Sequence, residues 1–167
     1  MKTAYLALGT NLGDRAQNLA NARRQLASEQ VRVARESSIY ETEPRYLRDQ
    51  PWFLNQVVEI ETDLFPRQLF ALVKKTERAL GRQPAQPNGP RAIDIDILFF
   101  GGAVVNTPDL EIPHPRMGER RFVLEPLVEI APDLRHPVTG RTVREMLADV
   151  KDQAVRKIDP GNGAGGA

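Results

Sequence analysis

The stretch from Gly89 to Phe100 reads Gly-Pro-Arg-Ala-Ile-Asp-Ile-Asp-Ile-Leu-Phe-Phe. Apolar and acidic residues alternate over its centre, which is typical of a half-buried strand because successive side chains point to opposite faces. Asp94 and Asp96 are therefore predicted to share one face of the strand, and the three isoleucines beside them are predicted to fill the core behind it: Ile93, Ile95 and Ile97. Aspartate is a poor strand former, so the pair favours a functional role, the binding of a cation, over a merely solvated strand edge.

Hydrophobic periodicity on either side of this strand predicts alternating strands and helices. Strands are expected at residues 4–8, 31–42 and 52–62, with helices from the N-cap Asp14 to about Ser28 and from Pro66 to Gly81. With the aspartate strand they give the order βαββαβ, the ferredoxin-like arrangement in which both helices cover one face of an antiparallel sheet. The predicted fold class is therefore α+β.

Three local patterns qualify this outline. The segment from Gly9 to Gly13 matches neither the dinucleotide fingerprint nor the phosphate loop, so it is interpreted as a turn. The first helix is expected to carry an apolar stripe and the second a solvated charged face: the stripe is Leu12, Leu19 and Leu26, and the charged face is Lys74, Glu77 and Arg78. The Pro-rich and Gly-rich loop at residues 81–90 is long enough to be a lid.

Beyond Phe100 the signals are shorter. We expect a short strand at residues 104–105, a rigid extended segment at 112–116, a helix at 122–130 entered through Pro126, and a last helix at 142–150 capped by Thr142. Residues 159–167 are rich in glycine and are expected to be disordered. The remaining residues, 1–158, are predicted to form a single domain.

Composition restricts the kind of partner. The 23 basic and 22 acidic residues give a net charge of +1, so no overall field attracts nucleic acid or an anionic membrane. The sequence has no cysteine, which excludes a thiol nucleophile and a thiolate metal site. Its apolar N-terminal run is too short for a signal peptide, and no stretch is long enough to span a bilayer. We therefore expect a soluble, cytoplasmic protein that is a monomer.

One strand offers surfaces suited to a flat heterocycle. Phe53 and Asn55 share one face of the strand at residues 52–62, so an aromatic plane lies beside an amide that both donates and accepts hydrogen bonds. Taken alone, the pattern favours ordinary core packing over a ligand site, because aromatics are common in cores.

The residues around the aspartates suggest a phosphate ligand. Mg²⁺ sites usually combine one or two carboxylates with waters and substrate phosphates, which points to a nucleoside triphosphate. Arginine is suited to phosphoryl oxygens, and five arginines are expected around the aspartate segment: Arg82, Arg91, Arg116, Arg120 and Arg121. His114 lies between two prolines in the same basic region. Phosphoryl transfer needs positioning and charge neutralisation more than a covalent nucleophile.

The segment from Gly89 to Leu98 resembles the signature of the 6-hydroxymethyl-7,8-dihydropterin pyrophosphokinase family of the folate pathway. The resemblance extends to four further segments and covers about residues 3–150: residues 7–13, 53–55, 80–82 and 113–124. It implies a ferredoxin-like core extended to a three-layer αβα sandwich. It also implies an ATP-dependent diphosphotransferase that moves pyrophosphate from ATP to 6-hydroxymethyl-7,8-dihydropterin and releases AMP.

The resemblance also implies roles residue by residue. Asp94 and Asp96 would hold two Mg²⁺ ions, and Arg82 and Arg91 would join them in catalysis. The expected ATP contacts are Lys74, Glu77, Arg82, Arg91, Ile97, His114 and Arg120. The expected pterin contacts are Thr42, Pro44, Phe53, Asn55 and Phe122, with the pterin stacked between the two phenylalanines.

Two other classes of function remain open at this stage. The first is a ferredoxin-like ligand-binding or RNA-binding module without catalysis, which would present an aromatic and basic sheet face. Aromatic residues are only 6% of the chain, and acidic residues occupy the face in question. The second is another Mg²⁺-dependent nucleotidyl enzyme with paired aspartates, which would release pyrophosphate instead of AMP.

Overall fold

The computed structural model describes residues 1–43, 50–81 and 92–158. A central antiparallel sheet has the strand order β5 (Asp94–Phe100), β1 (Lys2–Thr10), β4 (Phe53–Thr62), β3 (Ile39–Thr42) and β8 (Arg156–Ile158), with β2 (Val31–Glu36) also paired to β4. The predicted βαββαβ order is confirmed, because α1 (Arg15–Leu26) follows β1 and α2 (Pro66–Ala79) joins β4 to β5.

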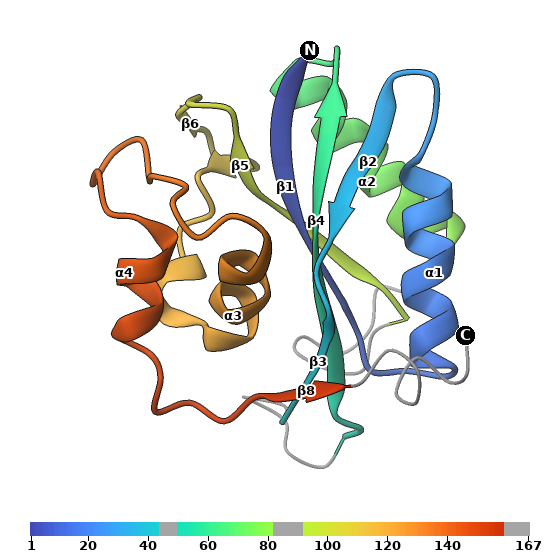
Figure 1. Ribbon diagram of the computed structural model, residues 1–167. Helices are drawn as coiled ribbons and strands as arrows, with labels where there is room; N and C mark the ends of the chain where they lie inside the picture. The colour runs from blue at the N-terminus through green and yellow to red at the C-terminus, as the bar shows by residue number, and fades with distance from the viewer. Residues whose placement is uncertain (44–49, 82–91, 159–167) are drawn as a thin grey trace.

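The helices lie on both faces of the sheet (Figure 1). Helices α1 and α2 cover one face, and α3 (Arg121–Ile130) and α4 (Val143–Ala148) cover the other. A short hairpin of β6 (Val105–Asn106) and β7 (Glu111–Ile112), followed by the 3₁₀ helix η1 (Met117–Glu119), connects β5 to α3. The described residues therefore form the three layers of an αβα sandwich, as expected.

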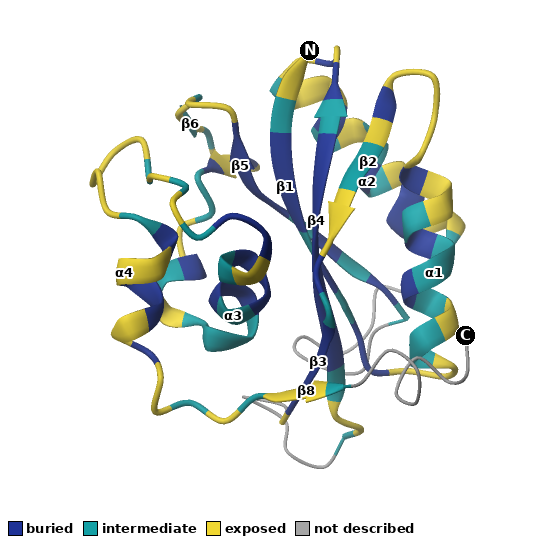
Figure 2. Cartoon of the chain, in the orientation of Figure 1, coloured by how far each residue is buried: buried dark blue, intermediate teal, exposed yellow. Residues whose placement is uncertain are grey.

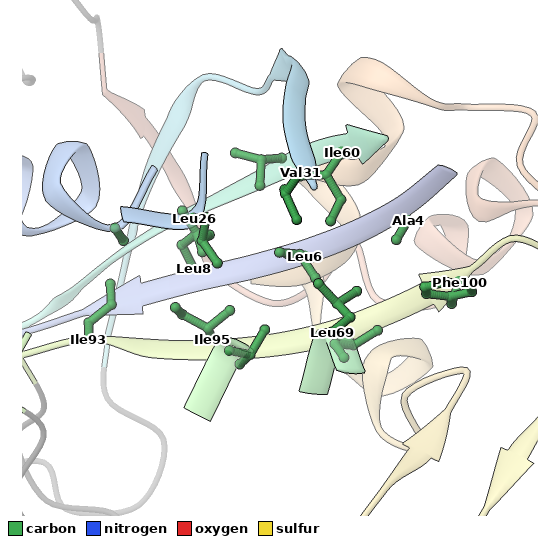
Figure 3. Packing of buried hydrophobic residues seen from close by; sticks show 14 of the residues in the cluster. Ala4, Leu6, Leu8, Leu26, Val31, Ile60, Leu69, Ile93, Ile95 and Phe100 are labelled. Atoms are coloured by element: carbon green, nitrogen blue, oxygen red, sulfur yellow. The ribbon is translucent and has the colours of Figure 1, made fainter. Parts of the chain in front are cut away.

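The central strands bury both of their faces, and Figure 2 shows β1 and β4 largely in dark blue between partly exposed helices. One core lies under α1 and α2, where Leu6, Leu69 and Ile95 pack together (Figure 3). A second core lies under α3 and α4 and contains Phe99 and Leu124. Alternate residues of β1, β4 and β5 point into the two cores, so these strands need apolar residues on both faces.

The predicted continuous strand at residues 31–42 is wrong in one respect, because it breaks at Ser37 and Ser38. The Ser37 backbone N–H donates to the Val57 carbonyl at 2.9 Å, and its hydroxyl accepts from the Val57 N–H at 2.9 Å. Gln56 Nε2 donates to the Ser37 carbonyl at 2.8 Å. These bonds to β4 replace the regular ladder, so β2 and β3 pair with different halves of the same strand.

Several expected boundaries also shift. The first helix begins at Arg15 rather than including Leu12, which is 47% exposed in the preceding turn, while the Asp14 side chain caps the helix as predicted. Pro126 does not open the third helix but lies inside it. The last helix is capped by Thr142 as predicted. Strand β8 was not anticipated, because three residues of mixed polarity have no periodicity of their own. The predicted lid and disordered tail, at residues 81–90 and 159–167, fall on residues mostly or wholly outside the described ranges.

Candidate active site

Asp94 and Asp96 share one face of β5, as the alternation predicts. The isoleucines on the opposite face, Ile93, Ile95 and Ile97, are at most 5% exposed and belong to the core under α1 and α2. Burial and, next in size, the negative charge of Asp94 raise the pKa of Asp96 to about 7, although Arg120 opposes the rise. The carboxylate pair therefore lies in an environment that a bound cation would relieve.

Both aspartates line a pocket on the α3 side of the sheet, here called the aromatic pocket. Its walls include the rings of Phe53 from β4 and Phe122 from α3, with a volume of about 170 Å³. A cavity of about 150 Å³ is large enough to bind benzene, so this one suits a small ring system rather than a polymer. The two phenylalanines that the sequence placed around one ligand do line one pocket.

Asn55 and Thr42 add a polar edge to the aromatic pocket. Asn55 Nδ2 donates to Thr42 Oγ1 at 2.8 Å, which fixes the amide so that its oxygen remains as an acceptor for a ligand. A Cβ atom at Gly9 would lie 3.4 Å from Asn55 Oδ1 and 3.9 Å from the Phe53 ring. The absence of a side chain at Gly9 therefore leaves space in the pocket beside Asn55 and Phe53.

Gly9 and Thr10 lie inside β1 and are not part of a turn, so the sequence interpretation of residues 9–13 is wrong at its first two residues. The strand continues because Gly9 pairs with both Asn55 and Asp94 on the neighbouring strands. Its role in the pocket was missed. The available signal was the alternation of small residues, Ala7 and Gly9, on the face of β1 that lines the aromatic pocket.

A second hollow, here called the β5 groove, lies between β5, α2 and the β6–β7 connection. Of the sequence-predicted ATP contacts, three line it: Lys74, Ile97 and His114. Asp96 lines the β5 groove as well as the aromatic pocket. The two hollows therefore meet at Asp96.

His114 is held in one tautomer by its own backbone surroundings. The imidazole Nδ1 accepts a hydrogen bond from the backbone N–H of Arg116 at 3.1 Å. The backbone N–H of His114 donates to the Leu98 carbonyl at 3.0 Å. Burial and, next in size, the positive charges of Arg120 and Arg116 lower the His114 pKa to about 4. The imidazole is therefore neutral at pH 7, and its proton lies on Nε2, which remains as a donor.

Glu77 does not belong to a solvated face, and the interpretation of the charged face of α2 is wrong at this residue. Glu77 is 1% exposed, and its Oε2 accepts a hydrogen bond from the Ile95 N–H at 2.8 Å. Its Oε1 lies 3.3 Å from Lys74 Nζ. The reason is that β5 is an edge strand, and this carboxylate takes the place of a neighbouring strand at its outer N–H.

The arginines divide between the site and the scaffold. Arg120 lines the aromatic pocket, and its guanidinium carbon lies 5.6 Å from the centre of the Phe122 ring. Arg121 instead donates to Glu125 and to the carbonyls of Lys151 and Gln153, so it holds α3 to the chain after α4. Pro44, Arg82 and Arg91 lie outside the described residues.

Asp94 and Asp96 are the two candidate protein ligands for a metal ion at this site. Among the residues that the structure describes, no group of three or more histidine and carboxylate side chains is placed to hold a metal. Asp94 and Asp96 alone fit an ion that completes its coordination with waters and substrate phosphates, as Mg²⁺ usually does.

The fold and the site together define an α+β sandwich in which two ligand-sized hollows meet at one of a pair of acidic residues. Comparison with known proteins makes the assignment specific. The sequence model of the 7,8-dihydro-6-hydroxymethylpterin-pyrophosphokinase (HPPK) family matches residues 5–132. The chain belongs to this family, whose members are transferases of the diphosphotransferase kind. The family membership predicted from the sequence is confirmed.

Two bacterial relatives are similar over most of their own length. A 2-amino-4-hydroxy-6-hydroxymethyldihydropteridine pyrophosphokinase from Methylorubrum extorquens is 45% identical over 160 residues, which are 95% of this chain and 100% of the relative. One of the same name from Bacillus subtilis is 46% identical over 138 residues, which are 82% of this chain and 83% of the relative.

Other relatives are much longer. The folic acid synthesis protein fol1 of Pneumocystis carinii is 39% identical over 159 residues, and the matching part is 95% of this chain but 22% of that protein. A crystal structure of Plasmodium falciparum HPPK-DHPS with pteroate superposes with a TM-score of 0.72 at 18% identity, over 89% of this chain and 42% of that chain. This structural likeness supports the fold. Within the described residues, no helix has the length and apolar character needed to cross a membrane.

Proposed function

We propose that this chain transfers pyrophosphate from ATP to 6-hydroxymethyl-7,8-dihydropterin, giving the dihydropterin pyrophosphate and AMP for folate synthesis. The observation that carries the proposal is that Asp96 lines both the aromatic pocket and the β5 groove. Two substrates bound in adjoining hollows would meet at the aspartate pair, where negative charge must be neutralised during phosphoryl transfer.

The pterin would occupy the aromatic pocket. Its flat ring would stack between Phe53 and Phe122, and its polar edge would bond to the Asn55 amide oxygen and to the backbone near Thr42. This orientation would point the hydroxymethyl group toward the aspartates. Pro44, which the family resemblance adds to this set, lies outside the described residues.

ATP would occupy the β5 groove, beside Lys74, Ile97 and His114. The neutral His114 would donate its Nε2 proton to a phosphate oxygen, and Arg120 would add positive charge from the other side of the aspartates. Glu77 would act on ATP indirectly, since its carboxylate is buried and holds the backbone of β5. Arg82 and Arg91 are proposed as further phosphate contacts from outside the described residues.

The reaction requires one bond to form and one to break. The substrate hydroxyl oxygen would attack the β-phosphorus of ATP, the bond from that phosphorus to the α–β bridging oxygen would break, and the hydroxyl proton would leave to solvent. Two Mg²⁺ ions held by Asp94 and Asp96 would neutralise charge on the phosphate oxygens when bound. The protein's own contribution is to align the two substrates and to supply Arg120 and His114 as fixed donors.

We also propose that residues 1–158 form a single domain, and that the protein acts as a cytoplasmic monomer without nucleic acid or membrane partners. The small net charge of +1 and the apolar residues buried within the described sandwich support this view.

The deciding experiment is a product analysis. The purified chain is incubated with Mg²⁺, ATP and 6-hydroxymethyl-7,8-dihydropterin, and the nucleotide products are separated by anion-exchange chromatography. The proposal predicts AMP and dihydropterin pyrophosphate in equal amounts, formed only when both substrates are present. Release of free pyrophosphate, with AMP attached to the second substrate, would instead identify a nucleotidyl transferase.

A further inference from the structure

A cluster of three charged side chains lies behind the aromatic pocket, on the opposite face of β3. Glu41 is at its centre: Oε2 accepts a hydrogen bond from Arg15 Nη1 at 2.8 Å, and Oε1 accepts one from Arg156. The next residue, Thr42, lines the aromatic pocket. Because successive side chains of a strand point to opposite faces, Glu41 points away from the pocket and toward α1. The three residues are called the Glu41 cluster below.

The Glu41 cluster joins the two strands that bear the pocket residues. Arg15 Nη1, besides bonding Glu41, donates to the Trp52 carbonyl at 2.9 Å. Glu41 directly precedes Thr42, Trp52 directly precedes Phe53, and Thr42 and Phe53 are register partners across β3 and β4. One guanidinium therefore links the Glu41 side chain to the Trp52 backbone, and each of these residues directly precedes one that lines the pocket.

Strand β8 completes the cluster from the far edge of the sheet. Strand β3 has only four residues, and three of them pair with β8, the last pair being Glu41 with Arg156. The ladder thus ends one residue before Thr42. On the other face of β8, Lys157 Nζ lies 3.3 Å from Glu129 of α3, whose carboxylate also accepts bonds from Ser38. Of two neighbouring residues of β8, Arg156 therefore bonds β3 and Lys157 bonds α3, while Arg15 supplies the link from Glu41 to α1. Figure 1 shows β8 at the edge of the sheet beside β3.

Because Glu41 is charged and nearly buried, the geometry of the Glu41 cluster depends on the hydrogen bonds from Arg15 and Arg156. The Glu41 side chain is 10% exposed. Burial alone would raise the pKa of Glu41, but the hydrogen bonds from Arg15 and Arg156 lower it below its usual value, so the carboxylate stays ionised. A buried charge that loses a partner is poorly tolerated, and the chain around it shifts to restore solvent or another donor.

We propose that Glu41 is a positioning residue for the dihydropterin, and that Arg15 and Arg156 hold it in place. None of the three touches the substrate in this scheme. They fix the backbone of β3 and β4 so that Thr42 orients the Asn55 amide and Phe53 presents its ring. The inference rests on the proposed function, since it assigns the pterin to the aromatic pocket, and it gives the C-terminal strand β8 a part in substrate affinity.

The test measures two affinities in each of three variants. Glu41→Gln keeps the shape of the side chain and removes its charge, Arg156→Gln removes one partner, and Arg156→Lys keeps that partner's charge. Binding of 6-hydroxymethyl-7,8-dihydropterin and of a non-hydrolysable ATP analogue is measured by calorimetry with Mg²⁺, each ligand also in the presence of the other. We expect the dihydropterin Kd to rise about tenfold in Glu41→Gln and about fivefold in Arg156→Gln, because the supporting contacts act through geometry near the pocket.

The ATP analogue, bound in the β5 groove, should keep its affinity within twofold in all three variants. Arg156→Lys should recover most of the dihydropterin affinity. The double variant Glu41→Gln with Arg156→Gln should resemble Glu41→Gln alone, since both changes break the same contact. Arg144→Gln is the matched control and should leave both affinities unchanged, because Arg144 of α4 forms an ion pair with Asp133, which precedes that helix, and neither residue lines the pocket.

The outcomes separate the two proposals. Normal dihydropterin binding in Glu41→Gln and Arg156→Gln would overturn the positioning role while leaving the proposed function intact. Equal losses for both ligands, accompanied by a lower urea midpoint, would also overturn it, because they indicate general destabilisation. A wild-type protein that binds ATP but no dihydropterin would overturn the proposed function itself, and the positioning role with it.

Discussion

Replacing Asp96 by asparagine should make the protein without ligands more stable and catalytically inactive. Asp94 and Asp96 lie two residues apart on one strand, so their Cα atoms are about 7 Å apart and their side chains point the same way. Two like charges at about 7 Å repel by about 2 kcal/mol at an effective dielectric constant of 20. The raised pKa of Asp96 shows that burial and this repulsion outweigh the attraction to Arg120. Asparagine keeps the shape and removes the charge.

We therefore expect the free energy of unfolding of Asp96→Asn to rise by about 2 kcal/mol at pH 8, and the Tm to rise by about 4–8 °C. Turnover should fall by at least about 10³-fold, since loss of a metal ligand removes several kcal/mol of transition-state stabilisation. Urea and thermal unfolding without Mg²⁺ measure the first effect, and AMP release measures the second. Addition of Mg²⁺ with an ATP analogue should stabilise the wild type more than the variant.

The control is Asp109→Asn, which removes a carboxylate that Arg67 and Thr107 hold by hydrogen bonds on the surface and that should not gain stability. An Asp96→Asn variant that is less stable than the wild type would refute the argument that the pair is strained. A variant with near-normal turnover would refute its role as a metal ligand.

Three further outcomes are expected. Asn55→Ala should weaken dihydropterin binding at least about tenfold and leave the ATP analogue within twofold, because a polar pocket group is lost from one hollow only; equal losses by calorimetry would contradict this. Glu77→Leu should lower the free energy of unfolding by about 2 kcal/mol in urea, since the buried Ile95 N–H loses its acceptor, whereas Glu77→Gln keeps one and should lose less. The pKa of His114 is about 4 when folded, against 6.5 in the unfolded chain, so its contribution to stability is complete above pH 6.5 and is lost as the pH falls toward 4. Between pH 7 and pH 5 the wild type should lose about 2 kcal/mol more than His114→Gln, and parallel pH profiles would show that His114 titrates normally.

The pattern of alternation was enough to predict the strand that bears the aspartates. Side chains two residues apart on a strand must share a face, so the grouping of Asp94 with Asp96 needed no tertiary information. The same local rule predicted that Phe53 and Asn55 point one way. Helix caps at Asp14 and Thr142 were also found, because a capping side chain bonds a backbone N–H within three residues of itself.

Local sequence patterns could not predict contacts between segments that are far apart in the chain. The charged face of α2 has the spacing of a solvated helix surface. Glu77 is nevertheless buried, because β5 is an edge strand and the Ile95 N–H donates to the Glu77 carboxylate. Gly9 looked like a turn residue, and only the pairing of β1 with both β4 and β5 makes it the floor of a pocket. Strand β8 is three residues long and is a strand only because β3 offers it an edge.

The sequence by itself determined the βαββαβ order of the first 100 residues, the shared face of the two aspartates and, through the family signature, the family. These features depend on local periodicity and on residue types at fixed spacing. The tertiary structure alone decided that Asp96 borders both hollows, that His114 keeps its proton on Nε2, and that Arg15 and Arg156 meet at Glu41. The meeting of the hollows and of the arginines depends on residues far apart in the chain, and the state of His114 depends on its burial. None of these is encoded in any single segment.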